Sequence, residues 1–143
     1  MDEKFIDKLS IFIDGASRGN PGPGAIGFVI YDQNGNILRE YAECIGNCTN
    51  NVAEYKALIK ALEFGSTHSR GEVICFMDSE LVVKQMNGSF RLKKTHLKEL
   101  FQEVKLKESM YKKVTYQNLP REHPKIVRVD KIVNKALDQL NEK

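Results

Sequence analysis

Four acidic residues have types and positions that could support metal-ion chemistry: Asp14, Glu54, Asp78 and Asp130. Asp14 and Asp78 each end an apolar run that predicts a β-strand. Glu54 lies in the first turn of a predicted helix, and Asp130 lies near the start of the last one. If the two strands are adjacent and parallel, both aspartates emerge at one edge of the sheet, toward which the helix starts also point. Carboxylates gathered there would repel one another and raise at least one pKa, and a divalent cation would remove that penalty.

Two interpretations of these acids stay open. Oxygen ligands without His or Cys favour Mg²⁺ or Mn²⁺ over zinc, so a magnesium or manganese site is one of them. Ordinary structural roles are the other, since Asp14 could open a turn and Asp78 could cap the helix that follows it. Glu54 could complete a capping box with Asn51 as the N-cap residue. Asp130 could be a solvated acid that complements its helix dipole.

The elements that would position these acids follow from the hydrophobic periodicity of the chain. Three strands come first, separated by a glycine–proline segment and by an Asn-Gly hairpin signal. Helical and apolar runs then alternate, which predicts an α/β fold. Its sheet would be mixed and five-stranded, with three antiparallel strands followed by parallel ones and with flanking helices. The predicted strands are 9–14, 25–32, 37–46, 72–79 and 113–120, and the predicted helices are 51–65, 80–88, 95–110 and 127–141.

Composition limits the class of protein. With 143 residues, 41% hydrophobic and 29% charged, the chain is expected to form a single domain over residues 1–143. A net charge of +3 is too small to indicate a nucleic-acid partner by itself. No run approaches the roughly 18 apolar residues that span a bilayer, and the first residues lack a signal-peptide stretch. We therefore expect no membrane association, a cytoplasmic location and, without heptads, a monomer.

The cysteines and histidines indicate no further metal or disulfide site. The three cysteines, Cys44, Cys48 and Cys75, are odd in number and form no C-x-x-C motif. The three histidines are scattered and form no H-x-x-x-H pair, so zinc is not expected.

Longer motifs carry a family resemblance. The chain contains, in order, IFIDGASRGNPGPGAIGFVI at 11–30, TNNVAEYKALIKAL at 49–62, FMDSELVVKQM at 76–86 and the late Asp130. These segments cover most of the chain and resemble type 1 ribonuclease H, in a short form without a basic protrusion. The resemblance implies the ribonuclease H-like fold and hydrolysis of the RNA strand of RNA–DNA hybrids, giving 5′-phosphate and 3′-hydroxyl ends. It also implies two divalent cations, Mg²⁺ or Mn²⁺, held by the catalytic carboxylates Asp14, Glu54, Asp78 and Asp130.

The resemblance further implies which residues contact the hybrid. Backbone groups near Asp14, together with Glu54, would read the 2′-hydroxyls that distinguish RNA from DNA. Thr49, Asn50 and Asn51 would contact the DNA strand, with Thr49 donating to a phosphate. A plain hairpin turn and helix capping are the structural alternatives for these segments. The implied substrate-binding residues are Gly15, Ala16, Ser17, Asn20, Thr49, Asn50, Asn51 and Ser79.

The sequence also departs from the family pattern. The region NGSFRLKKTHLKEL is short, and its Arg91, Lys93 and Lys94 form only a modest basic patch. The histidine that many relatives place before the last helix would align near Pro120. His123 could substitute for it from a shifted loop, or it could simply precede a proline at the helix start.

Three more residues stay open at this point. Arg121 and Glu122 could act as auxiliary residues in place of His123. Glu80 stands where many relatives carry an amide, so it could tune ion affinity or act as an exposed first-turn acid.

Two other functions fit the same fold. The chain could be a nuclease that also cuts double-stranded RNA, because the preference for hybrids is weakly specified by the motifs. It could also be a catalytically silent nucleic-acid-binding module, although the presence of all four carboxylates argues against this.

Overall fold

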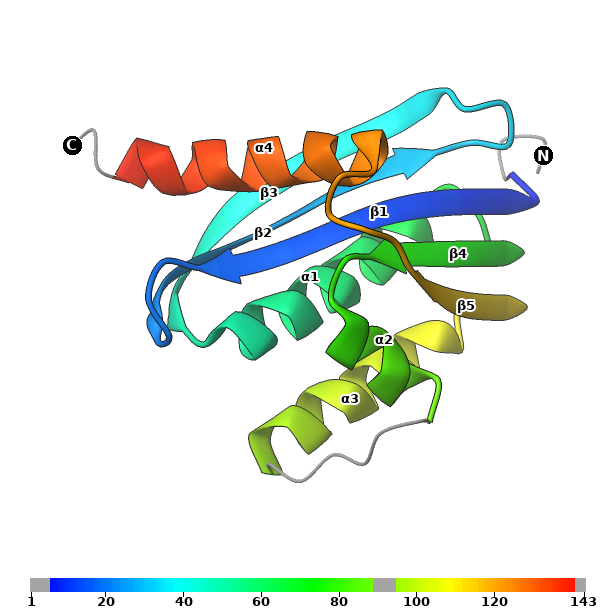
Figure 1. Cartoon of the computed structure of the whole chain (residues 1–143). Coiled ribbons are helices and arrows are strands. Elements are labelled where there is room, and N and C mark those ends of the chain that lie inside the picture. Colours follow the sequence, from blue (N-terminus) through cyan, green and yellow to red (C-terminus); the bar gives the residue numbers. More distant parts are fainter. Residues whose placement is uncertain (1–5, 89–94, 141–143) are drawn as a thin grey trace.

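A computed structural model describes residues 6–88 and 95–140 of the chain, and a mixed five-stranded sheet lies at its centre (Figure 1). The strand order is β3-β2-β1-β4-β5, in which β1 pairs antiparallel with β2 and parallel with β4. This topology is the predicted one. The strands are β1 (Lys8–Ser17), β2 (Gly22–Tyr31), β3 (Ile37–Cys48), β4 (Glu72–Met77) and β5 (Lys113–Asn118).

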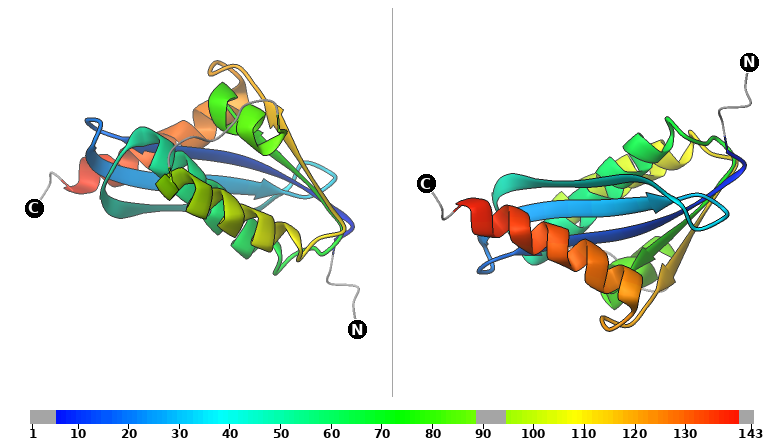
Figure 2. Two further views of the ribbon diagram at one scale, coloured as in Figure 1. Left: turned by 90° about the horizontal axis from the view of Figure 1, so that it is seen from below. Right: turned by 90° about the horizontal axis from the view of Figure 1, so that it is seen from above.

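Helices cover both faces of the sheet. They are α1 (Asn50–Gly65), α2 (Glu80–Met86), α3 (Thr95–Glu108) and α4 (Pro124–Leu140). Figure 2 shows α1, α2 and α3 on one face, with α4 alone across the other. No helix in the described ranges is long and apolar enough to span a membrane.

Alternation along the central strand explains why both faces are covered. Ile11 and Ile13 of β1 pack into the core beneath α1 to α3, whereas Phe12 packs with Ile126 and Val129 of α4. Successive side chains of a strand point to opposite faces, so a strand with apolar residues at every position must be buried on both sides.

The first two strands are longer than predicted. β1 continues through Asp14 to Ser17, because its pairing with β2 extends as far as Ser17 opposite Gly24. Asp14 therefore lies inside a strand and does not end it. The glycine–proline segment accordingly contributes Gly22–Gly24 to β2, so the connecting loop is shorter than the motif.

Two helix starts also differ from the prediction. The N-cap of α1 is Thr49, whose Oγ1 accepts from the Val52 N–H at 3.3 Å, so Asn51 lies inside the helix and forms no capping box. The last helix begins at Pro124, which places Asp130 in its second turn and not at its start. His123 precedes that proline, and its carbonyl accepts from the Val127 N–H at 2.8 Å.

Candidate active site

Asp14 and Asp78 lie on neighbouring strands at the edge where β1 and β4 part. The last pair of the parallel ladder is Phe12 with Phe76, so each aspartate stands two residues beyond it. β4 ends at Met77, whereas β1 continues beside β2. The two carboxylates therefore meet at one edge of the sheet, as the sequence predicts.

Close packing of α1 on β1 brings Glu54 to the same place. A Cβ atom on Gly15 would lie 2.2 Å from the carbonyl oxygen of Ala53 and 2.7 Å from the nitrogen of Glu54. Only glycine permits this approach of helix to strand. Gly15 thus sets the distance between the strand that carries Asp14 and the helix that carries Glu54.

The electrostatics of Asp14 show that four carboxyl groups share this region. Asp14 is only 8% exposed. Burial raises its pKa to about 7, and the charges of Asp78, Asp130 and Glu54 add to that rise. Repulsion among like charges in a desolvated place has this effect on an acid. The four predicted ligands, which come from β1, the residue after β4, α1 and α4, are therefore close enough for the other three charges to act on Asp14.

Glu54 and Asp78 show the same trend with partial compensation. Burial raises the pKa of Glu54 to about 7, and the Ser79 hydroxyl, which donates to Glu54 Oε1 at 3.2 Å, opposes the rise. The pKa of Asp78 is raised by burial, while the nearby Arg121 guanidinium lowers it. Arg121 Nε lies 3.9 Å from Asp78 Oδ2.

The donor set fits a hard divalent cation. Asp14 Oδ2 is buried and has no hydrogen-bond partner among the described residues, so one strong acceptor is left free. Among the residues that the structure describes, no group of three or more His, Cys, Asp or Glu side chains is arranged to hold an ion by itself. Mg²⁺ commonly takes one or two carboxylates and completes its shell with water and substrate phosphate. The residues therefore suit a site that the substrate completes.

A polar hollow lies beside the carboxylates, at the start of α1. The Asn50 N–H donates to Asn20 Oδ1 at 2.9 Å, and Asn50 Oδ1 accepts from the Ser17 N–H at 2.9 Å. These bonds connect the end of β1 and the β1–β2 loop to the helix start. The hollow has a volume of about 310 Å³ and is lined by Asn20, Thr49, Asn50, Asn51, His96 and Leu97.

The hollow thus gathers four of the residues predicted to bind substrate and adds His96, which sequence reasoning missed. No sequence signal marked His96, because it reaches the hollow only through the packing of α3 against α1. Gly15, Ala16 and Ser17 lie along β1 between Asp14 and this hollow.

Comparison with known families shows to which family the chain belongs. The profile of the reverse transcriptase-like family matches residues 12–136. The chain belongs to this family. One curated relative, ribonuclease HI of Halobacterium salinarum, is 36% identical over 133 residues, which cover 92% of this chain and 65% of that protein. A bifunctional protein of Mycobacterium tuberculosis is also 36% identical over 132 residues, but this chain spans only 36% of its length.

Solved structures of reverse transcriptase-like relatives share the fold. The N-terminal ribonuclease H domain of the Mycobacterium tuberculosis protein has a TM-score of 0.88 and 35% identity, covering 94% of this chain and 96% of that chain. LC11 ribonuclease H1, in complex with an RNA/DNA hybrid, has a TM-score of 0.82 and 44% identity, covering 92% and 98% of the two chains. The predicted fold and the resemblance to type 1 ribonuclease H are both confirmed.

His123 lies directly before α4 and contacts both that helix and β1. Its Nδ1 accepts from the Lys125 N–H at 3.1 Å, and its ring stacks on Phe12 with centroids 5.8 Å apart. The first contact is that of a helix N-cap residue, and the second packs the ring against β1. Its auxiliary role in catalysis stays a prediction, as does that of the exposed Glu122.

Glu80 lies within the described residues, whereas the predicted basic patch does not. Glu80 Oε2 lies 2.8 Å from Lys84 Nζ one turn along α2, so its charge is compensated on the helix surface. Arg91, Lys93 and Lys94 lie outside the described residues.

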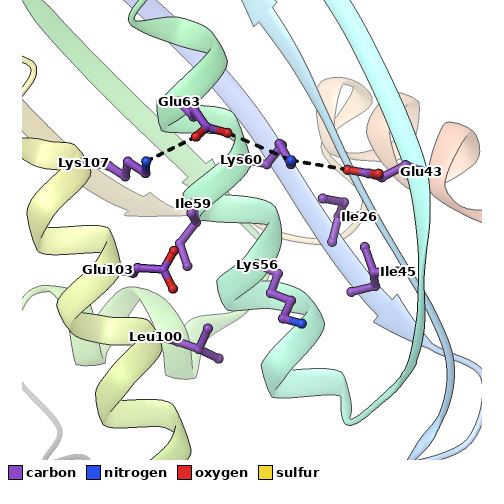
Figure 3. Close-up of a pocket in the computed structure, with 10 residues that line it drawn as sticks. All are labelled: Ile26, Glu43, Ile45, Lys56, Ile59, Lys60, Glu63, Leu100, Glu103 and Lys107. Atoms are coloured by element: carbon purple, nitrogen blue, oxygen red, sulfur yellow. Dashed lines mark hydrogen bonds and ion pairs between the residues drawn. The ribbon is translucent and has the colours of Figure 1, made fainter.

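A second pocket contains none of the predicted site residues. It has a volume of about 330 Å³ and lies between α1, α3 and the β2–β3 edge (Figure 3). Its floor is apolar and its rim carries both signs of charge. The lining residues are Ile26, Glu43, Ile45, Lys56, Ile59, Lys60, Glu63, Leu100, Glu103 and Lys107.

Proposed function

We propose that this chain is a metal-dependent endoribonuclease that hydrolyses the RNA strand of RNA–DNA hybrids, leaving 5′-phosphate and 3′-hydroxyl ends. The observation that carries the proposal is the cluster formed by Asp14, Glu54 and Asp78 with Asp130, in which Asp14 is buried and raised in pKa to about 7. Such a cluster is unfavourable unless cations join it. A relative crystallised with an RNA/DNA hybrid is 44% identical to this chain, which supports the choice of substrate.

The four carboxylates would hold two divalent cations, Mg²⁺ or Mn²⁺, together with the scissile phosphate. When bound, the cations would lower the pKa of the attacking water and stabilise charge on the leaving 3′-oxygen. Asp14 would contribute its unpartnered Oδ2. Ser79 would keep Glu54 oriented through its 3.2 Å hydrogen bond.

Substrate selection would come from groups on either side of Asp14. The backbone of Gly15, Ala16 and Ser17 would read 2′-hydroxyls, which only the RNA strand carries. The polar hollow would receive the DNA strand, with Thr49 and the side chains of Asn20, Asn50 and Asn51 as hydrogen-bonding groups. Contacts to phosphate fix the register of a duplex without reading its sequence.

Arg121 would act beside the metal site. Its side chain is 86% exposed, and its guanidinium lies 3.9 Å from Asp78. An exposed guanidinium in that position can bind a substrate or product phosphate and balance charge on Asp78. His123 and Glu122, in the same loop, would support that placement.

A panel of labelled duplexes tests the proposal. Cleavage of the RNA strand of a hybrid should require Mg²⁺ or Mn²⁺ and should stop in EDTA. A matched RNA–RNA duplex and a matched DNA–DNA duplex should remain intact. Cutting of the RNA–RNA duplex at a similar rate would favour the broader nuclease, and hybrid binding without cleavage would favour the silent binding module.

A further inference from the structure

Arg18 connects the loop between β1 and β2 to the last helix. Its Nη2 lies 2.6 Å from Oδ1 of Asp138. The same nitrogen donates to the carbonyl oxygen of Asn134 at 3.3 Å and to Asn134 Oδ1 at 3.2 Å. A single side chain therefore joins two segments that are more than a hundred residues apart in sequence.

Both ends of this connection lead to the candidate active site. On the loop side, Asn20 stands two residues after Arg18 and bonds to Asn50 at the start of α1. On the helix side, Asn134 Nδ2 donates to the carbonyl oxygen of Asp130 at 3.0 Å. Arg18 thus lies between a predicted substrate-binding loop and the helix turn that carries a predicted metal ligand.

The loop is tightly folded on the backbone of Arg18 itself. The Arg18 N–H donates to the carbonyl oxygen of Pro23 at 2.8 Å, which closes the loop. A Cβ atom on Gly22 would lie 2.1 Å from the Arg18 carbonyl oxygen, so the two ends of the loop are in direct contact. Fixing Arg18 therefore fixes the whole loop, including Asn20.

The position of Asp138 in α4 explains why it pairs with Arg18. Asp138 lies in the last turn of α4, where no basic residue is present and where a negative charge opposes the helix dipole. Arg18 supplies the missing positive charge from another element. The two side chains are 40% and 62% exposed, and exposed pairs contribute little to overall stability.

We propose that Arg18 is a positioning residue for hybrid binding. By binding Asp138 and Asn134, it holds the β1–β2 loop in a fixed position relative to Asp130. Asn20 and the backbone of Gly15, Ala16 and Ser17 are then held in position to bind the duplex beside the carboxylates. This inference rests on the proposed function.

Matched single variants test the proposal through the split between KM and kcat. Arg18→Ala and Asp138→Ala should each raise KM for a hybrid by about three- to ten-fold with kcat little changed, since a mobile loop must be ordered on binding. The double variant should be no worse than either single one, because both remove the same contact. Exchanging the charges, with Arg18→Asp and Asp138→Arg together, should recover part of the lost affinity.

Asp138→Ala separates positioning from direct contact. If Arg18 instead bound a substrate phosphate, Arg18→Ala would weaken binding and its salt dependence, while Asp138→Ala would leave binding unchanged or make it tighter. That pattern, or an unchanged KM in Arg18→Ala, would overturn the proposal. Arg128→Ala is the control. Arg128 lies on the same helix as Asp138 but forms its exposed ion pair with Glu40 of β3, so this variant should leave KM unchanged.

A measurement without substrate keeps this inference distinct from the proposed function. Amide hydrogen exchange at Arg18, Gly19, Asn20 and Gly22 should become faster in Asp138→Ala, and exchange at the last three should become faster in Arg18→Ala. Unaltered exchange would contradict the connection. If the wild-type protein cleaves no hybrid, the proposed function fails. If it cleaves and Arg18→Ala has the same KM, only the inference about Arg18 fails.

Discussion

Two clusters of charged side chains lie along α1, and they balance their charge in opposite ways. In the pocket between α1 and α3, Lys60 Nζ lies 3.7 Å from Glu43 and 4.0 Å from Glu63 (Figure 3). Lys107 Nζ lies 3.2 Å from the other oxygen of Glu63. Glu43 and Glu63 therefore each have a base beside them, so these acids are paired within the chain.

In the carboxylate cluster around Asp14, most of the acids have no base beside them among the described residues. Four acids share it, and the base that the structure places beside them among the described residues is Arg121, 3.9 Å from Asp78. The pKa of Asp14 and that of Glu54 are raised to about 7 as a result of burial and mutual repulsion. This difference is expected if the paired cluster serves the fold and the unpaired one binds a cation from solution.

The largest expected effect is on catalysis. Asp14→Asn and Asp78→Asn should each reduce hybrid cleavage by more than the roughly 10–100-fold that is lost when a residue merely supports a metal ligand. Steady-state cleavage at saturating Mg²⁺ measures this, and circular dichroism checks that the fold is intact. Glu63→Gln, in the paired cluster, is the control and should keep wild-type activity. Near-normal cleavage by either aspartate variant would refute the ligand assignment.

The same Asp14→Asn variant should be more stable than wild type when no divalent ion is present. A pKa raised from 3.8 to about 7 means that the ionised Asp14 destabilises the folded state at pH 8. Removing that charge should increase the free energy of unfolding by on the order of 2–4 kcal/mol. Urea denaturation in EDTA at pH 8 measures the change. A loss of stability would mean that the cluster is not under electrostatic strain.

Stability should also depend on pH in a direction set by these acids. Because their pKa values are higher in the folded state, the folded protein binds more protons between pH 4 and 7 than the unfolded chain. Stability should therefore fall as pH rises through that window in EDTA. Mg²⁺ should reduce the fall, since it favours the ionised carboxylates. Urea denaturation at pH 5.5 and at pH 8, with and without Mg²⁺, measures both effects, and a rise in stability over this range in EDTA would contradict the account.

The smallest effect is expected in the paired cluster. Lys107→Ala removes an exposed ion pair to Glu63 and should lower stability by about 0.2–1 kcal/mol. Hybrid cleavage should not change, because this pocket contains none of the proposed catalytic residues. Thermal unfolding and the cleavage assay measure the two quantities. A large loss of activity in this variant would show that the two clusters are not separate in function.

Periodicity and turn chemistry predict most of the fold. The apolar runs and the alternation between strand and helix patterns yield the order of elements, and the parallel pairing of the first and fourth strands follows from them. The position of Asp14 within β1 was missed because β1 has two neighbours of different length. Pairing with β4 ends before Asp14, and pairing with β2 continues to Ser17. A single sequence does not carry that difference.

Cap positions and long-range contacts account for the other differences. Thr49 and Asn51 are both good N-cap residues, so the local sequence did not decide which one starts α1. The carboxylates were predicted because each follows a recognisable element boundary and because the motifs resemble a known family. Arg18 was not predicted, since its partners Asn134 and Asp138 depend on the packing of α4 across the sheet.

Binding of Mn²⁺ to the protein without substrate tests the central claim most directly. Paramagnetic broadening of backbone amide resonances localises the ion, and Asp14→Asn is the matched variant. We expect broadening centred on Asp14, Glu54 and Asp78 in the wild-type protein, and its loss in the variant. Broadening elsewhere in the molecule, or equal broadening in both proteins, would contradict the account that these carboxylates are held together for a divalent cation.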